Sequence, residues 1–131
     1  MLKIHHIGIV VKDIAAYLKS SQYRKSTEVI YDPIQHSNIC ILVNIYKEPP
    51  IELIEPIDEK STTYQHLKKN GTSMHHLCYE IDSYEKLKEY MKQHRLKRVF
   101  GPVEAIVFNR KKVVFCYSVN TGIVEFLLLR D

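Results

Sequence analysis

The chain has 131 residues and a formal net charge of +4, with 45% apolar and 26% charged residues. These values are typical of a globular protein and predict one compact domain, residues 1–131, that can bury a core without disulfides. Basic residues are interleaved with Asp and Glu, and no nucleic-acid-binding motif is present, so we expect no nucleic-acid partner.

Three isolated cysteines, Cys40, Cys78 and Cys116, lie among apolar or β-forming neighbours. An odd count without a CxxC pair is typical of a reducing compartment, and we interpret all three as small core residues. The N-terminal residues have no apolar segment after a basic start, and no stretch is long enough to span a membrane. The sequence therefore predicts a cytoplasmic protein without a membrane partner.

The first half of the chain predicts strands separated by two helices. Asp13 is a good helix cap before 14–23, and a Ser/Thr start and a Gly stop mark a second helix at 61–71. The Ile- and Val-rich or otherwise β-forming segments predict strands at 3–11, 27–32, 38–46 and 51–56.

The second half repeats this order. A strand is predicted at 74–81, followed by a helix at 83–95 that Ser83 can cap and that has apolar residues on one face. Breaks at Gly101–Pro102, Asn109–Arg110 and Asn120–Thr121 separate four strand-like segments, 96–100, 105–108, 112–118 and 122–129.

This order reflects a degenerate internal repeat. HHIGIVVKDI at 5–14 resembles HHLCYEIDSY at 75–84, and IELIEP at 51–56 resembles VEFLLL at 124–129. Each half runs strand, helix and three strands, and ends on a strand with a Glu between apolar residues. The sequence predicts an α+β fold of two tandem βαβββ modules, about 1–70 and 71–131.

Four repeated residues form the candidate metal site: His6, Glu52, His76 and Glu125. An ionised carboxylate in a strand that is apolar on both sides is costly unless it is paired or bound to a metal. If the modules pack about a pseudo-twofold axis, two imidazoles and two carboxylates converge, which suits a divalent transition metal. The alternative is a buried His–Glu cluster without metal. His5 and His75 should face the other side of their strands or support the ligands.

The segments IHHIGIVVKDI, IELIEP, MHHLCYEID and TGIVEFLLL, in this order, resemble the vicinal oxygen chelate superfamily of glyoxalase I, methylmalonyl-CoA epimerase, extradiol dioxygenases and antibiotic-resistance proteins. The similarity is greatest to the epimerase branch. It implies two βαβββ modules whose sheet curves around a metal cleft, ligands at the four positions above, and a homodimer.

Two positions depart from the epimerase pattern. The resemblance implies Gln as the second ligand, where this chain has Glu52, so the set is His, Glu, His, Glu, as in bacterial glyoxalase I. It also implies a catalytic Glu near the third strand, where this chain has Gln35, a neutral amide that cannot take up a proton.

The leading hypothesis is proton transfer next to a carbonyl, assisted by one Ni, Co, Mn, Fe or Zn ion. Glu125 is the first candidate base, with Glu52 as its partner. Gln35 can donate a hydrogen bond to the substrate, and Arg110 or Lys111 can meet an anionic group. The substrate is an acyl-CoA such as methylmalonyl-CoA, for an isomerase, or a thiol adduct of methylglyoxal, for a lyase.

The alternative hypothesis is a different class of protein, a non-catalytic binder of small molecules with the same fold. Such binders typically lack the metal ligands that this chain retains. A dioxygenase needs an iron site with two His and one carboxylate, and the extra Glu52 argues against that.

Overall fold

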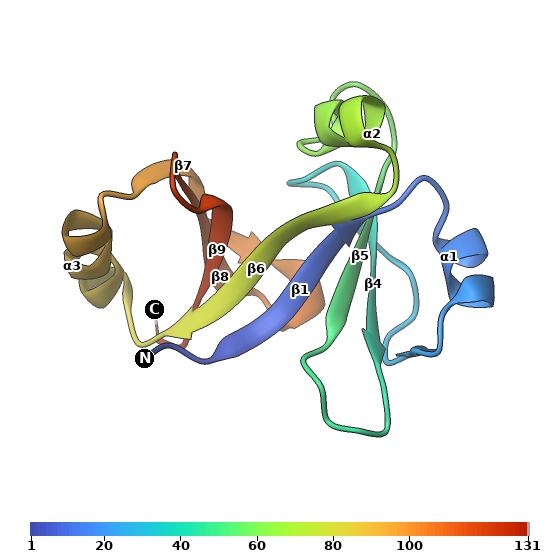
Figure 1. Cartoon of the computed structure of the whole chain (residues 1–131), viewed down its shortest axis with the longest axis horizontal. Helices are drawn as coiled ribbons and strands as arrows, with labels where there is room; N and C mark the ends of the chain where they lie inside the picture. The colour runs from blue at the N-terminus through green and yellow to red at the C-terminus, as the bar shows by residue number, and fades with distance from the viewer. Residues whose placement is uncertain (131) are drawn as a thin grey trace. The chain divides into compact units, whose positions relative to one another are not determined.

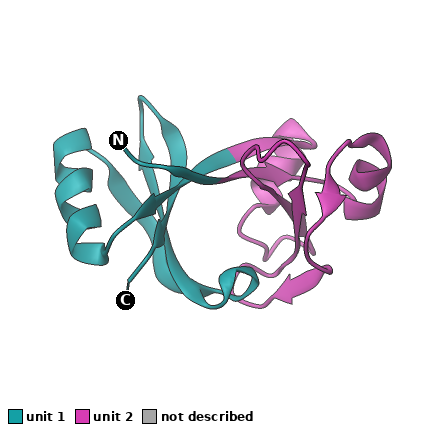
Figure 2. Ribbon diagram, turned by 90° about the horizontal axis from the view of Figure 1, so that it is seen from below, with its two compact units in different colours: residues 1–5, 76–131 teal, residues 6–75 magenta. Residues whose placement is uncertain are grey.

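The computed structural model describes residues 1–130 and has two compact units (Figure 2). The N-terminal unit is residues 6–75, and the C-terminal unit is residues 1–5 together with the chain from His76 onward. No helix within residues 1–130 is long and apolar enough to cross a membrane.

The N-terminal unit contains a sheet in the order β2–β4–β5–β1, with β3 also paired to β4. β1 runs parallel to β5, and the other pairs are antiparallel. The elements of this half of the chain are β1 (Ile4–Val10), α1 (Ile14–Ser20), β2 (Arg24–Lys25), β3 (Ile30–Asp32), β4 (Ser37–Val43), β5 (Ile51–Pro56) and α2 (Tyr64–Asn70) (Figure 1).

The C-terminal unit contains a sheet in the order β6–β9–β8–β7, in which β6 is parallel to β9 and the other pairs are antiparallel. Its elements are β6 (Ser73–Ile81), α3 (Tyr84–His94), β7 (Lys97–Ala105), a 3₁₀ turn (Ile106–Phe108), β8 (Lys111–Ser118) and β9 (Gly122–Leu128). Each half of the chain thus runs strand, helix and further strands, and the predicted α+β fold of tandem βαβββ modules is confirmed.

Alternation along β5 and β9 places apolar side chains on the helix-facing side of each sheet. Ile51 and Leu53 of β5 pack with Ile14 of α1. In the C-terminal unit, Val124, Phe126 and Leu128 of β9 pack with α3. Glu52 and Glu125 fall at the intervening positions, so their side chains point to the opposite faces.

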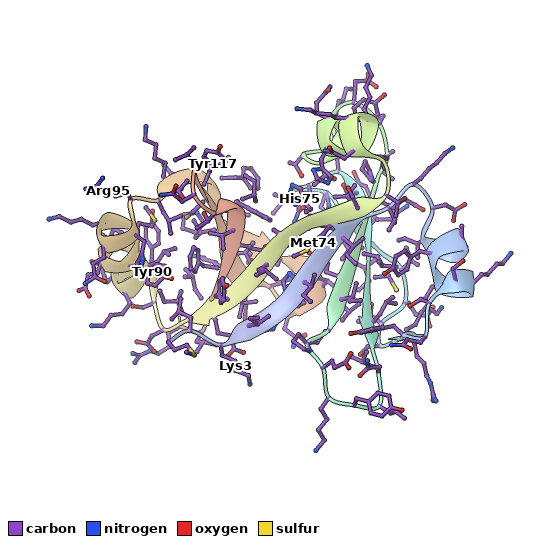
Figure 3. All side chains as sticks on the ribbon, in the orientation of Figure 1. Lys3, Met74, His75, Tyr90, Arg95 and Tyr117 are labelled. Atoms are coloured by element: carbon purple, nitrogen blue, oxygen red, sulfur yellow. The ribbon has the colours of Figure 1, made fainter. Side chains whose placement is uncertain are left out.

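The helix α3 forms as its sequence predicts. Ser83 caps it by accepting the Lys86 N–H at 3.3 Å, and Leu87 is fully buried against the sheet. Tyr90 extends from the helix toward the sheet (Figure 3) and meets the ring of Phe126 with centroids 5.5 Å apart. Aromatic packing of this kind fixes the helix over β9.

Two predicted features of the last module are wrong. Gly101–Pro102 does not end a strand but lies within β7, where the register with β8 shifts twice between Arg98 and Val103. A bulge tolerates proline because no ladder hydrogen bond is needed there. Residues 106–108 form a 3₁₀ turn instead of a strand, and the following Asn109 has a left-handed backbone, which turns the chain into β8.

Candidate metal centre

The first His–Glu pair lies in the N-terminal unit and follows from the register of two parallel strands. Gly8 of β1 is the partner of Glu52 on β5. His6 lies two residues before Gly8 and therefore points to the same face as Glu52. Its Nε2 is 3.3 Å from Oε1 of Glu52, and the two residues are 0% and 2% exposed.

The second pair lies in the C-terminal unit and repeats this arrangement. Cys78 of β6 is the partner of Glu125 on β9, and His76 lies two residues before Cys78. Nε2 of His76 is 3.1 Å from Oε1 of Glu125, with 2% and 1% exposure. The ring of Phe115 meets the His76 imidazole edge-on, with centroids 5.2 Å apart.

The two registers are equivalent, because Ile7 opposite Ile51 corresponds to Leu77 opposite Val124. The repeat seen in the sequence is therefore also a repeat of side-chain geometry. In each doublet the second His meets the Glu. The first His of each doublet contacts another ring of its own unit. His5 contacts the ring of Phe108, and His75 contacts the ring of His66, each with centroids 4.9 Å apart.

The chemistry of each pair suits a metal. Burial of a carboxylate without compensation is expensive, and a nearby imidazole nitrogen offsets part of that cost. Each pair supplies one imidazole nitrogen and one carboxylate oxygen, a mixed donor set accepted by several divalent transition metals. His6 with Glu52 and His76 with Glu125 are the residues that would hold such an ion.

Gln35 is buried, at 5% exposure, in the turn between β3 and β4. Its backbone N–H donates to Oδ1 of Asp32 at 3.2 Å. Its carbonyl accepts the Ser37 hydroxyl and the Thr62 N–H, each at 3.2 Å. The backbone of Gln35 is therefore held at three points.

Arg110 and Lys111 are exposed at the start of β8. Nη1 of Arg110 lies 3.6 Å from Oε2 of Glu104. Nζ of Lys111 donates to the carbonyl of Leu129 at 3.4 Å. Both cations thus have partners on the surface of the C-terminal unit, and an anionic substrate group would compete with those partners.

His36 joins a hydrogen-bonded chain in the N-terminal unit. Its Nδ1 is 2.7 Å from the Tyr31 hydroxyl, and its Nε2 is 3.2 Å from Oδ2 of Asp58. The Lys60 N–H and then the His36 imidazole lower the pKa of Asp58. No local pattern signals this chain, because Asp58 is distant in sequence.

The three cysteines are fully buried, as predicted. Burial raises the pKa of Cys116 to about 11, and desolvation also raises the pKa of Cys40. Neutral, buried thiols of this kind behave as small apolar core residues.

Comparison with known proteins agrees with this architecture. The curated methylmalonyl-CoA epimerase of Dictyostelium discoideum mitochondria is 25% identical over 128 residues, covering 94% of this chain and 76% of that protein. A crystal structure of a hypothetical protein from Bacillus halodurans C-125 has a TM-score of 0.82 and 26% identity, covering 99% of this chain and 96% of the other.

A variant of the Streptomyces coelicolor methylmalonyl-CoA epimerase, solved in complex with 2-nitronate-propionyl-CoA, has the same fold. Its TM-score is 0.79 at 18% identity, covering 96% of this chain and 93% of the other. The family model described as "Glyoxalase/Bleomycin resistance protein/Dioxygenase superfamily" matches residues 5–116. The chain therefore belongs to the glyoxalase/bleomycin resistance protein/dioxygenase superfamily.

Proposed function

We propose that this chain is a divalent-metal-dependent isomerase that moves a proton next to the carbonyl of an acyl-CoA thioester, as a methylmalonyl-CoA epimerase does. The observation that carries the proposal is the repeated His–Glu pair. Both pairs are buried, with N–O distances of 3.3 Å and 3.1 Å. Two equivalent pairs at equivalent registers are hard to explain as separate structural ion pairs.

In this proposal His6, Glu52, His76 and Glu125 bind one metal ion together. When bound, the ion supplies Lewis-acid stabilisation of the negative charge that develops on the carbonyl oxygen. The two imidazoles serve as neutral nitrogen donors, and their strands fix their orientation. The ion is Ni, Co, Mn, Fe or Zn, because this donor set does not select strongly among them.

The carboxylates carry the proton in this scheme. Glu125 removes it from the carbon next to the carbonyl, and the electron pair of the broken C–H bond moves onto the carbonyl oxygen. Glu52, which enters the cycle protonated, gives its own proton to the opposite face and inverts the centre, and the proton left on Glu125 then exchanges with solvent. The Gln35 amide donates a hydrogen bond to the substrate, and Arg110 or Lys111 meets its carboxylate.

The relatives support an acyl-CoA substrate. The Dictyostelium relative is named an epimerase of methylmalonyl-CoA, and the Streptomyces structure holds 2-nitronate-propionyl-CoA. Glu52 favours a second candidate, glyoxalase I-type isomerisation of a thiol hemithioacetal, because the resemblance implies Gln at this position in the epimerases.

A deuterium-exchange assay separates these candidates. The metal-loaded protein would be incubated in D₂O with methylmalonyl-CoA, or with the hemithioacetal of methylglyoxal and a thiol. We expect metal-dependent incorporation of deuterium next to the thioester carbonyl of methylmalonyl-CoA. Formation of the lactoyl thioester alone would favour the glyoxalase, and turnover of neither substrate by metal-loaded protein would favour a non-catalytic binder.

A further inference from the structure

A basic pocket lies in the N-terminal unit, where β1 ends and the loop before β6 begins. Its volume is about 300 Å³. Its lining combines two lysines, an aromatic ring, a leucine and two small residues. The six lining residues are Lys12, Tyr64, Leu67, Lys68, Gly71 and Thr72.

The pocket has a defined construction. The Lys12 N–H donates to the Thr72 hydroxyl at 3.1 Å, which joins the end of β1 to the loop before β6. Gly71, with a φ of 70°, donates its N–H to the Leu67 carbonyl at 2.7 Å and ends α2 there. The Thr72 hydroxyl, having accepted one hydrogen bond, can still donate its own.

The charge of the pocket is uncompensated by its lining. No carboxylate is among the lining residues, and within residues 1–130 neither Lys12 nor Lys68 forms an ion pair. The adjacent Asp13 is engaged in capping α1 through the Ala16 N–H. Two lysines in one pocket with the apolar surfaces of Tyr64 and Leu67 are complementary to a phosphate-bearing ligand.

The pocket lies one strand length away from the candidate metal ligand His6. The β1 ladder continues to Val11, whose N–H donates to the Ile54 carbonyl at 2.9 Å. From His6 to Val11, the residue before Lys12, the chain therefore extends about 17 Å at the rise of an extended strand. That span is comparable to the reach of an extended pantetheine arm.

We propose that the pocket formed by Lys12, Lys68, Tyr64 and Thr72 binds the phosphates of the acyl-CoA substrate. This inference rests on the proposed function, because it takes the reacting thioester to lie near His6. The lysines recognise the phosphates, and the Tyr64 and Leu67 side chains provide apolar contact. The pocket would then select CoA thioesters over thioesters that lack a nucleotide.

The test is calorimetric titration of the metal-loaded protein with propionyl-CoA and with propionyl-pantetheine, which lacks the nucleotide phosphates. The K12A/K68A variant should bind propionyl-CoA about tenfold more weakly, as expected for two exposed charge contacts. Its affinity for propionyl-pantetheine should match that of the unchanged protein. K19A/K69A removes the same charge from α1 and α2 outside the pocket and should bind both ligands normally.

Unchanged propionyl-CoA affinity in K12A/K68A overturns this inference, as does an equal loss for propionyl-pantetheine. Neither result tests the proposed proton transfer, which the deuterium-exchange assay measures separately. Conversely, selective loss of propionyl-CoA binding in a protein that catalyses no exchange would support the pocket and overturn the proposed isomerase.

Discussion

Replacing Glu125 by Gln should remove most of the stabilisation that a bound metal gives the fold. The substitution keeps the shape of the side chain but removes the charged oxygen donor that lies 3.1 Å from His76. A ligand that binds only the folded state stabilises it by about 2.7 kcal/mol when present at about 100 times its Kd.

The expected loss follows from this linkage. If the amide weakens metal binding about 100-fold, the same metal concentration stabilises the variant by only about 0.4 kcal/mol. The difference is about 2.3 kcal/mol. For a chain of 131 residues, with an unfolding entropy of about 2.1 cal/mol/K per residue, it lowers the Tm of the metal-loaded protein by about 8 °C.

The assay is thermal unfolding of wild type, Glu125→Gln and Glu52→Gln with and without metal. Because the pairs share register and burial, Glu52→Gln should lose a similar part of the metal-induced shift. Glu104→Gln, an exposed change on β7 of the C-terminal unit, should keep it. If metal raises the Tm of Glu125→Gln as much as that of wild type, Glu125 is not a metal ligand.

Three further predictions concern the core, the pH dependence and the catalytic residues. Phe126→Ala empties a position that is 1% exposed and should lower the free energy of unfolding by about 3–5 kcal/mol in urea titrations; a loss below about 1 kcal/mol would contradict the packing against α3. The pKa of Cys116 is raised from 9.0 to about 11, so its stabilising contribution is complete below pH 9.0 and lost as the pH rises toward 11. That loss is at most about 3 kcal/mol, and Cys116→Val should flatten the alkaline decline of the free energy of unfolding. Gln35→Glu adds a carboxylate at the position where the resemblance implies the catalytic base of the epimerases. The substitution should therefore raise the rate of deuterium exchange into methylmalonyl-CoA. An unchanged rate would show that the residue at position 35 takes no part in proton transfer.

The sequence predicted the fold well because its signals were local or repeated. Ser83 and the apolar face of α3 specified that helix, and the two Glu-bearing strands indicated the repeat. The failures were tertiary in origin. In the sequence, Gly101–Pro102 predicts the end of a strand. In the structure, a bulge in the pairing with β8 accommodates these two residues within β7.

The His–Glu pairs were predictable only in part. The repeat identified His6 and His76 as equivalent, but the distance of each imidazole to its Glu depends on strand register, which the sequence alone does not specify. The basic pocket was not predicted, because Lys12 and Lys68 are far apart in sequence and line one pocket only in the folded chain, where the Lys12 N–H donates to Thr72. Likewise, His36 finds Asp58 through folding and not through a motif.

A crystal structure of the metal-loaded protein, with anomalous scattering recorded at the metal absorption edge, would test whether one ion binds both His–Glu pairs. We expect one anomalous peak per chain, bonded to Nε2 of His6 and His76 and to carboxylate oxygens of Glu52 and Glu125. A chain without a peak at these residues, or with separate ions on the two His–Glu pairs, would contradict this expectation.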